Sequence, residues 1–109
     1  LPDFLRNELR DAVDKTAANT QMTLNLALSY SGRWELIEAI KNISNLYKED
    51  KLNIEDINES LVSSHLRTKG MPDPDLLIRS GGEMRISNFL LWQIAYSEIF
   101  ISDVFLARF

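Results

Sequence analysis

The sequence predicts an α/β fold in which a partial, mainly parallel sheet is flanked by helices. Apolar and polar residues alternate over Thr20–Ser29 and Ser97–Ser102, a compact apolar run covers Asp75–Ile78, and segments with helical periodicity separate these stretches. Strands separated by helices pair mainly in parallel, through right-handed crossovers. We expect residues 1–109 to form a single α/β unit whose sheet continues into strands outside them.

The first helix is predicted from Pro2 to about Ala18, because apolar residues recur there at helical spacing and Asp3 suits a first turn. The period then changes to two over Thr20–Ser29, which favours a strand. Either face of this strand could be buried. Its larger apolar positions are Met22, Leu24, Leu26 and Leu28.

A second helix is predicted from Arg33 to about Tyr47, after a turn at Ser31 and Gly32. One face of it is apolar, and Glu38 and Lys41 lie on the solvent side. The apolar face comprises Trp34, Ile37, Ile40, Ile43, Leu46 and Tyr47. Asn53 is then predicted to cap a helix from Ile54 to about Leu66, and Ile57, Leu61, Val62 and Leu66 face the core.

The composition limits the classes of function. With 109 residues and 45% hydrophobic content, the chain has room for one core. Its net charge of −4 argues against non-specific nucleic-acid binding, and the absence of cysteine excludes disulfides and thiolate zinc sites. The longest apolar run, Phe89–Ala95, is far shorter than the ~20 residues of a membrane helix. No phosphate loop, dinucleotide fingerprint or nucleophile elbow is present.

An anion site is predicted at the end of the Asp75–Ile78 strand. This strand delivers Arg79 to its carboxyl edge, where open α/β sheets place ligands. Arg85 follows, and Gly81 and Gly82 between the two arginines permit positive φ, so that successive N–H groups could converge. Forked, permanently charged arginine donors suit phosphate. Ser87 or Asn88 is predicted to cap an apolar helix whose positive end faces the same space.

Glu98, Arg33 and His65 are the other polar residues that invite a site assignment. Glu98 lies in an otherwise apolar stretch and therefore needs a partner, either an arginine of the site, which the residues alone favour, or a hard cation such as Mg2+. Arg33 is a second candidate anion contact, with surface pairing to Glu35 or Asp75 as an equal alternative. His65 has no second imidazole nearby and is predicted to be a solvated helical residue.

Two blocks of the chain resemble signatures of one enzyme family. Residues 79–100 read RSGGEMRISNFLLWQIAYSEIF and resemble very closely the carboxyl-terminal signature of cis-prenyltransferases, the undecaprenyl diphosphate synthase family. Residues 24–40 read LNLALSYSGRWELIEAI and resemble the family's second signature. With the lead-in TAANTQMTLN, the resemblance covers essentially the whole chain. The chain departs from the family pattern at three places. Ser31 stands where the family usually has glycine, Ser80–Gly82 is a variant of the family's turn, and the ending Phe105–Phe109 lacks the usual tryptophan-proline-aspartate.

The resemblance implies that these residues are the carboxyl-terminal half of a cytoplasmic enzyme. Such an enzyme condenses isopentenyl diphosphate onto an allylic diphosphate, here expected to be farnesyl diphosphate, with Mg2+ as cofactor. Carried over by position, Arg79, Arg85 and Ser87 hold the diphosphate of isopentenyl diphosphate, and Glu98 helps to hold Mg2+. Met22 is implied to line a hydrophobic tunnel, with ordinary core packing as the equal alternative.

The resemblance also implies a homodimer of isoprenoid biosynthesis, without a transmembrane segment and at most peripheral to a membrane. The aspartate motif that binds the allylic diphosphate through Mg2+ is absent, so no catalytic residue is expected in this chain and the chain alone is expected to be inactive. Two other classes stay open: a non-catalytic dimerisation module that uses Phe89–Trp92, and a binding domain for another phosphorylated ligand.

Overall fold

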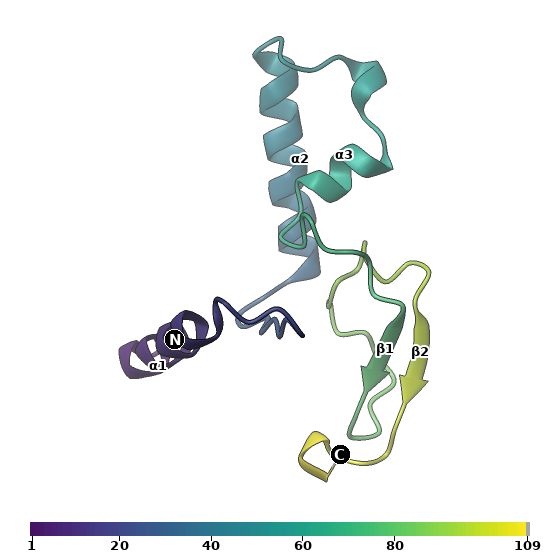
Figure 1. Ribbon diagram of the computed structural model, residues 1–109. Helices are drawn as coiled ribbons and strands as arrows, with labels where there is room; N and C mark the ends of the chain where they lie inside the picture. The colour runs from purple at the N-terminus through teal and green to yellow at the C-terminus, as the bar shows by residue number, and fades with distance from the viewer. Residues whose placement is uncertain (109) are drawn as a thin grey trace.

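The computed structural model describes residues 1–108 and contains helices and a small sheet (Figure 1). The elements in chain order are α1 (Asp3–Thr16), α2 (Gly32–Lys48), the short 3-10 turn η1 (Ile54–Asp56), α3 (Glu59–Ser64), β1 (Leu76–Arg79), β2 (Glu98–Ile101) and η2 (Leu106–Arg108). Phe109, the last residue of the atypical ending, lies outside the described residues. Within the described part, no helix has the length and apolar character needed to cross a membrane.

The sheet confirms the predicted class. β1 and β2 pair in parallel, with a register that runs from Leu76 opposite Glu98 to Arg79 opposite Ile101. Arg79 therefore lies at the carboxyl end of its strand, as predicted. The backbone continues the pairing beyond this point, because Ser102 N donates a hydrogen bond to Arg79 O at 2.9 Å.

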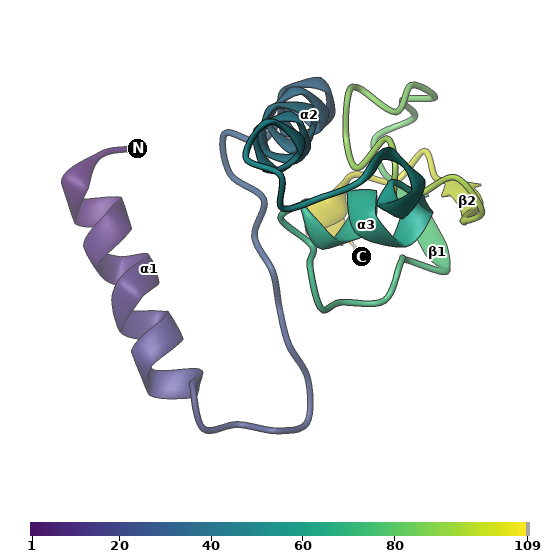
Figure 2. The ribbon, with the colours of Figure 1, turned by 90° about the horizontal axis from the view of Figure 1, so that it is seen from above.

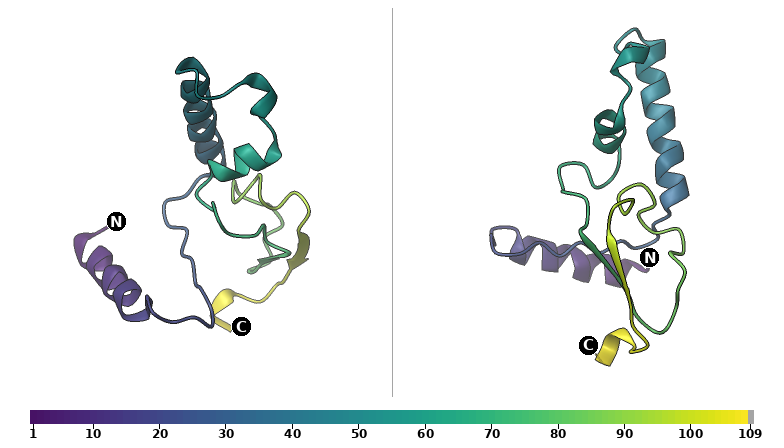
Figure 3. Two further views of the ribbon diagram at one scale, coloured as in Figure 1. Left: turned by 45° about the horizontal axis from the view of Figure 1, so that its top comes forward. Right: turned by 90° about the vertical axis from the view of Figure 1, so that its right-hand side faces the viewer.

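The chain is more open than a compact domain of its size. Its radius of gyration is 17.1 Å, whereas about 13 Å is typical for 100 residues. Figures 2 and 3 show α1 held away from α2 and from the sheet, and α1 contains no buried residue. The buried hydrophobic residues of the described part are Ala39, Ile43, Leu66 and Ile94. The core is small, and large apolar surfaces remain uncovered.

Helix α2 buries a narrower stripe than the sequence predicts. Ser31 caps the helix, because its Oγ accepts a hydrogen bond from Trp34 N at 3.3 Å. Glu35, Ala39 and Ile43 are buried at i, i+4 spacing. The predicted apolar face is therefore only partly correct. About half of the surface of each of these other members is exposed: Trp34, Ile37, Ile40 and Tyr47.

The predicted helix from Ile54 to about Leu66 is interrupted. Its beginning is η1, and Ile57 then adopts extended dihedral angles (φ −79°, ψ 112°). Asn58 starts α3, because its Oδ1 accepts a hydrogen bond from Leu61 N at 2.9 Å. A second capping residue within the segment thus divides one predicted helix into two, while Leu66 is buried as predicted.

The strand predicted over Thr20–Ser29 is wrong. The segment forms an open connection between α1 and α2 (Figure 2). Among the described residues, its backbone exchanges no hydrogen bond with another segment. A strand depends on ladder hydrogen bonds to a neighbour, which an alternating pattern alone cannot supply. The apolar residues are strongly exposed, at 85% for Met22, 79% for Leu24, 59% for Leu26 and 46% for Leu28.

The helix predicted to open at Ser87 or Asn88 is also wrong. Ser87, Asn88 and Leu90 have positive φ angles of 55°, 62° and 44°, which a right-handed helix excludes. The reason is a non-local contact. Asn88 O accepts a hydrogen bond from Gly32 N at 2.8 Å, and Asn88 Oδ1 accepts one from Arg33 N at 3.0 Å. Asn88 therefore caps the beginning of α2 and not a helix of its own.

We expect Asn88→Gly to lower the free energy of unfolding by about 0.5–1.5 kcal/mol, because glycine keeps the positive φ but removes the side-chain acceptor of Arg33 N. Urea unfolding followed by tryptophan fluorescence measures this loss. Ser87→Gly is the matched control, since Ser87 has a similar φ and no described side-chain hydrogen bond. Equal losses in the two variants would contradict a capping role for Asn88.

Candidate functional site

Two glycines form the turn between the arginines of the predicted anion site. Gly81 and Gly82 have φ angles of 75° and 74°, which favour glycine. Gly81 N donates a hydrogen bond to Val104 O at 3.0 Å, and Gly82 N donates one to Ser102 O at 2.8 Å. The predicted convergence of these N–H groups on an anion is therefore wrong, because the backbone already uses both. The turn instead ties the arginine loop to the chain that follows β2.

Arg79 and Arg85 line one hollow of about 250 Å³. The register places Leu77 opposite Ile99 and Arg79 opposite Ile101, so these four side chains share a face of the sheet. The remaining lining residues are apolar apart from Arg85: Ile78, Met84, Ile86 and Phe89. Among the residues that the structure describes, neither arginine forms a salt bridge. Two permanently charged groups thus share an apolar hollow without a protein counter-ion.

The other two predicted diphosphate and metal residues lie outside this hollow. Ser87 is exposed and is not among the lining residues. Glu98 pairs with Leu76, at the opposite end of the strand pair from Arg79, and strand alternation turns its side chain to the opposite face. The expectation that Glu98 needs a partner is wrong, because this residue is exposed and water can solvate its charge.

The structure does not bring the other candidates, His65, Arg33 and Met22, into a common site. Within residues 1–108, no group of three or more His, Cys, Asp or Glu side chains is placed to hold a metal ion. His65 ends α3 and is half-buried. Arg33 is exposed, and no ion pair with Glu35 or Asp75 is described. Met22 is 85% exposed, and its role in a tunnel stays a prediction.

The apolar residues predicted to supply an interface, Phe89–Trp92, are largely used within the chain. All four are half-buried. The Phe89 ring packs edge-on against Tyr30, with ring centroids 5.9 Å apart. Leu91 approaches Gly32 so closely that a Cβ there would lie 2.9 Å from Leu91 Cγ. This segment is therefore packed against the beginning of α2, and it leaves less free surface for a partner than the sequence suggests.

Glu35 is a buried carboxylate whose role the sequence interpretation missed. It is 3% exposed. Its Oε1 accepts a hydrogen bond from Arg67 N at 2.6 Å, and its Oε2 accepts from the Tyr30 hydroxyl and from Gln93 Nε2, the latter at 3.2 Å. Three donors satisfy a charge that would otherwise be costly to bury. The sequence contains one signal for this burial: Glu35 lies four residues before Ala39 and eight before Ile43, on the face of α2 that is buried.

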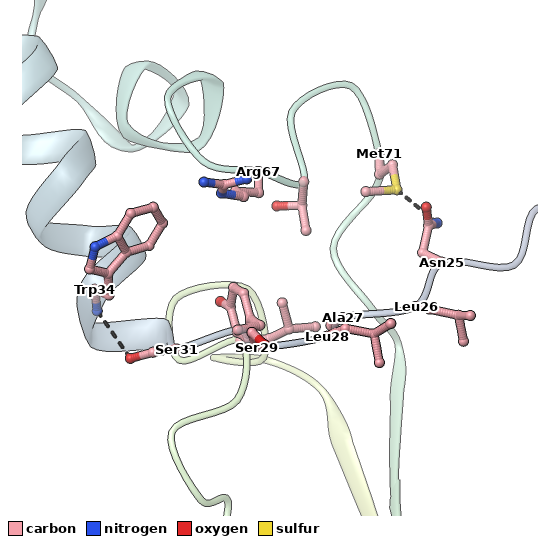
Figure 4. A pocket seen from close by; sticks show the side chains of 12 residues that line it. Asn25, Leu26, Ala27, Leu28, Ser29, Ser31, Trp34, Arg67 and Met71 are labelled. Atoms are coloured by element: carbon pink, nitrogen blue, oxygen red, sulfur yellow. Dashed lines mark hydrogen bonds between the residues drawn. The ribbon is translucent and has the colours of Figure 1, made fainter. Parts of the chain in front are cut away.

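A second hollow, of about 590 Å³, is lined by Tyr30 and Arg67, two of the residues that donate hydrogen bonds to Glu35 (Figure 4). One wall is the open segment from Asn25 to Ser31, and the other is formed by α2 and the loop after α3. The Arg67 guanidinium lies 5.0 Å from the centroid of the Trp34 ring, a cation–π distance. Asn25 Nδ2 donates a weak hydrogen bond to Met71 Sδ at 3.3 Å. Among the described residues, Asn25 to Tyr30 form no backbone hydrogen bond with another segment, so side chains hold this part of the open segment against the rest of the chain.

Comparison with solved structures defines the class of protein. The crystal structure of lavandulyl diphosphate synthase from Lavandula x intermedia, in complex with dimethylallyl diphosphate, matches all of this chain with a TM-score of 0.88 and 36% identity, over 47% of its own length. A probable undecaprenyl diphosphate synthase from Campylobacter jejuni matches 96% of the chain, with a TM-score of 0.71 and 36% identity, over 46% of its length. The arrangement is that of the carboxyl-terminal part of a cis-prenyltransferase.

Sequence comparison identifies the family. The profile described as putative undecaprenyl diphosphate synthase matches residues 1–109, and the chain belongs to this family. The isoprenyl transferase of Porphyromonas gingivalis is 52% identical over 103 residues, which are 94% of this chain and 41% of that protein. That of Bacillus subtilis is 51% identical over 104 residues, 95% of this chain and 40% of that protein. The chain therefore spans about two fifths of these relatives.

Burial of the Tyr30 hydroxyl raises its pKa to about 12, and the hydrogen bond to Glu35 and the charge of Glu35 act in the same direction. The unfolded pKa is about 10, so neutral Tyr30 stabilises the fold below that pH. We expect this contribution to be lost as the pH rises from about 10 through about 12. Tyr30→Phe removes the tyrosinate and with it this part of the pH dependence, which urea unfolding at several pH values measures.

Tyr96→Phe is the control for this prediction, because Tyr96 is 95% exposed. It should keep the pH dependence of the unaltered chain. A Tyr30→Phe chain that loses stability with pH as steeply as the Tyr96→Phe chain would show that Tyr30 ionises normally.

Proposed function

We propose that this chain forms the isopentenyl diphosphate-binding part of an enzyme that condenses isopentenyl diphosphate onto an allylic diphosphate. The observation that carries this proposal is the hollow shared by Arg79 and Arg85. Isopentenyl diphosphate consists of a charged diphosphate and a short branched hydrocarbon. Two forked cations suit the first part, and the apolar lining suits the second. Similarity to a synthase whose structure holds dimethylallyl diphosphate supports a diphosphate ligand.

In the proposed reaction, the terminal alkene carbon of isopentenyl diphosphate attacks the allylic carbon of the second substrate. The allylic carbon–oxygen bond breaks, diphosphate leaves with the bonding electrons, and a proton is lost to restore a double bond. Arg79 and Arg85 act by holding the diphosphate of the attacking substrate, so that its alkene is aligned. We assign to Ser87 a hydroxyl contact with the same diphosphate, next to Arg85.

The chain fits Mg2+ only in part. Mg2+ in phosphate-transferring sites is usually held by one or two carboxylates together with substrate oxygens. Glu98 is an exposed carboxylate that offers one such ligand, but it lies on the opposite face of the sheet from Arg79. When bound, Mg2+ would neutralise developing charge on a leaving diphosphate.

The chain by itself is expected to be inactive. Aligning two substrates in one site can supply roughly 7–11 kcal/mol of barrier reduction, and this requires a site for each substrate. The described residues provide one hollow with paired arginines. The Bacillus subtilis relative is about two and a half times as long as the region that it shares with this chain, since that region is 40% of it. We assign binding of the allylic substrate to the remaining part of such an enzyme.

We expect Arg79→Ala and Arg85→Ala each to weaken the binding of isopentenyl diphosphate by about 10–150-fold, because each removes a charge-assisted contact worth about 1.5–3 kcal/mol. Arg79→Lys should recover only part of the affinity, since an ammonium cannot reproduce the fork. Isothermal titration of the chain measures these constants.

Arg6→Ala in α1 is the control for charge, because this arginine is exposed and lies outside the hollow. Titration with inorganic pyrophosphate tests the contribution of the hydrocarbon. Unchanged affinity in both alanine variants would refute the anion site. Equal affinity for pyrophosphate and isopentenyl diphosphate would favour a different phosphorylated ligand.

For Glu98, we expect Glu98→Gln to leave the melting temperature unchanged without Mg2+, because this residue is exposed and no ion pair is described for it. If Glu98 is a ligand, the variant should need several-fold more Mg2+ to reach half of the stabilisation that Mg2+ gives the unaltered chain in the presence of isopentenyl diphosphate. Glu83→Gln is the control carboxylate. Identical Mg2+ titrations of the three proteins would exclude Glu98 as a ligand.

A further inference from the structure

We propose that Ser102 is a positioning residue for the candidate anion site. It begins the segment Ser102–Phe105, which we call the strap, and the strap holds the Gly81–Gly82 turn in the shape that brings the two arginines together. The inference rests on the proposed function, because the anion in question is the diphosphate of isopentenyl diphosphate.

The two arginines share a hollow only because the chain reverses between them. Arg79 and Arg85 are six residues apart, and six residues of extended chain span about 20 Å. Both nevertheless line one hollow of about 250 Å³. The Gly81–Gly82 turn makes the reversal, with φ angles of 75° and 74° that glycine adopts without strain. The shape of this turn therefore sets the separation of the two guanidinium groups.

The backbone of Ser102 contacts both the strand before this turn and the turn itself. Its N–H donates a hydrogen bond to Arg79 O at 2.9 Å, and its C=O accepts one from Gly82 N at 2.8 Å. Ser102 also directly follows Ile101, which pairs with Arg79 and lines the arginine hollow. One residue thus joins the end of β1, the turn and a wall of the hollow.

The side chain of Ser102 shapes the rest of the strap. Its Oγ accepts a hydrogen bond from Val104 N at 3.1 Å, which turns the strap back on itself. In this turned conformation, Val104 O accepts a hydrogen bond from Gly81 N at 3.0 Å. Asp103 also lies against the turn, because a Cβ at Gly82 would lie 3.4 Å from Asp103 Oδ1. The Ser102 hydroxyl therefore organises the surface on which the two glycines rest.

The strap depends on these hydrogen bonds because it has no core of its own. Asp103, Val104 and Phe105 are exposed, and Ser102 is half-buried. Segments with few buried apolar contacts open locally at a low cost in free energy. A ligand that binds both arginines favours the formed turn, and by reciprocity a strap with its hydrogen bonds formed favours the ligand. We therefore expect the affinity of the arginine hollow to depend on the strap.

The experiment compares Ser102→Ala with Ser97→Ala. Ser97 is the matched control, because it precedes β2 as Ser102 follows it, is also half-buried, and has a hydroxyl that makes one described hydrogen bond, to Pro74 O. Isothermal titration with inorganic pyrophosphate and with isopentenyl diphosphate, well below the melting temperature of each variant, measures the affinity.

We expect Ser102→Ala to weaken the binding of both ligands by about 2–10-fold, the effect of losing one neutral hydrogen bond. Ser102→Thr keeps the hydroxyl and should restore the affinity. Ser97→Ala should leave the affinity unchanged, although it removes a hydrogen bond of the same kind.

Gly82→Ala and Gly70→Ala form a second matched pair. The two glycines have similar positive φ angles, 74° and 83°, so that alanine is strained about equally at both. A Cβ at Gly70 would meet nothing within 4 Å, whereas a Cβ at Gly82 would meet Asp103 of the strap. We expect Gly82→Ala to weaken pyrophosphate binding by about 5–30-fold, because the strain falls on the turn. Gly70→Ala should leave this affinity unchanged.

Hydrogen exchange provides a measurement that a purely structural role of Ser102 would not change. Saturating pyrophosphate should slow the exchange of the Gly81, Gly82 and Val104 amides at least threefold in the unaltered chain, because the ligand favours the strap with its hydrogen bonds formed. Without ligand, the same amides should exchange faster in Ser102→Ala. The Lys51 amide, which lies beyond the far end of α2, is the control and should be unaffected.

Three results would each overturn the inference. They are equal affinities in the two serine-to-alanine variants, equal affinities in the two glycine-to-alanine variants, and turn and strap amides that pyrophosphate does not protect.

Failure of the proposed function gives a different pattern. Equal affinity of the unaltered chain for pyrophosphate and isopentenyl diphosphate refutes the proposed substrate, while the variants titrated with pyrophosphate still decide the role of the strap. A preference for isopentenyl diphosphate, together with equal affinities in the two serine-to-alanine variants, supports the proposed function and refutes the role of Ser102. Binding of neither ligand overturns both.

Discussion

The buried carboxylate of Glu35 connects three segments that are far apart in the sequence. It lies in α2 and accepts hydrogen bonds from Arg67 N, beyond α3, and from Gln93, beyond β1. Because only four hydrophobic residues of the described part are buried, this network replaces part of an ordinary core. A charge that is almost entirely removed from water is tolerated only while its donors stay in place. The carboxylate therefore fixes how α2 meets the loop that carries the arginines.

Hydrogen bonds at both ends of that loop position the candidate anion site. At one end, Gly81 and Gly82 donate to the chain that follows β2. At the other end, Asn88 accepts hydrogen bonds from the first turn of α2 and donates one to Ser31 Oγ at 2.7 Å. Arg85 lies between these two attachments. A loop held in this way needs little extra ordering when a ligand binds, which favours affinity.

The parts of this fold that follow from local sequence were predicted, and the parts that depend on distant contacts were not. The α1 and α2 helices and the two strands have clear periodicity, and the end of β1 placed Arg79 correctly. Asn88 looked like the cap of its own helix because no local pattern reveals that α2 would use it. The network around Glu35 joins residues separated by up to 58 positions, a distance over which periodicity carries no information.

The strand prediction for Thr20–Ser29 was wrong for a different reason. Its alternation is a real strand pattern, but a strand is a property of a pair, and the described chain offers it no neighbour. The same limit applies to Glu98. Its sequence neighbours are apolar, yet they are exposed where the sheet ends, and the carboxylate consequently remains in water. An alternating or apolar pattern predicts that a strand has neighbours on both sides. The exposure of a residue in this chain depends only on the two strands that the described sheet contains.

The arginine hollow and the larger hollow differ in how firmly the chain holds their walls. The arginine hollow is built from β1, β2 and the loop between them, all of which are already fixed within the chain. One wall of the larger hollow is the open segment, in which the backbone of Asn25 to Tyr30 forms no described hydrogen bond with another segment. Tyr30 is a link between them, because it lines the larger hollow, donates a hydrogen bond to Glu35 and packs against Phe89, which lines the arginine hollow. Ordering the open segment can therefore bias the arginine hollow through Tyr30, and also through the hydrogen bonds that join Asn88 to Ser31 and Gly32. By reciprocity, a ligand in that hollow favours the ordered segment by the same amount.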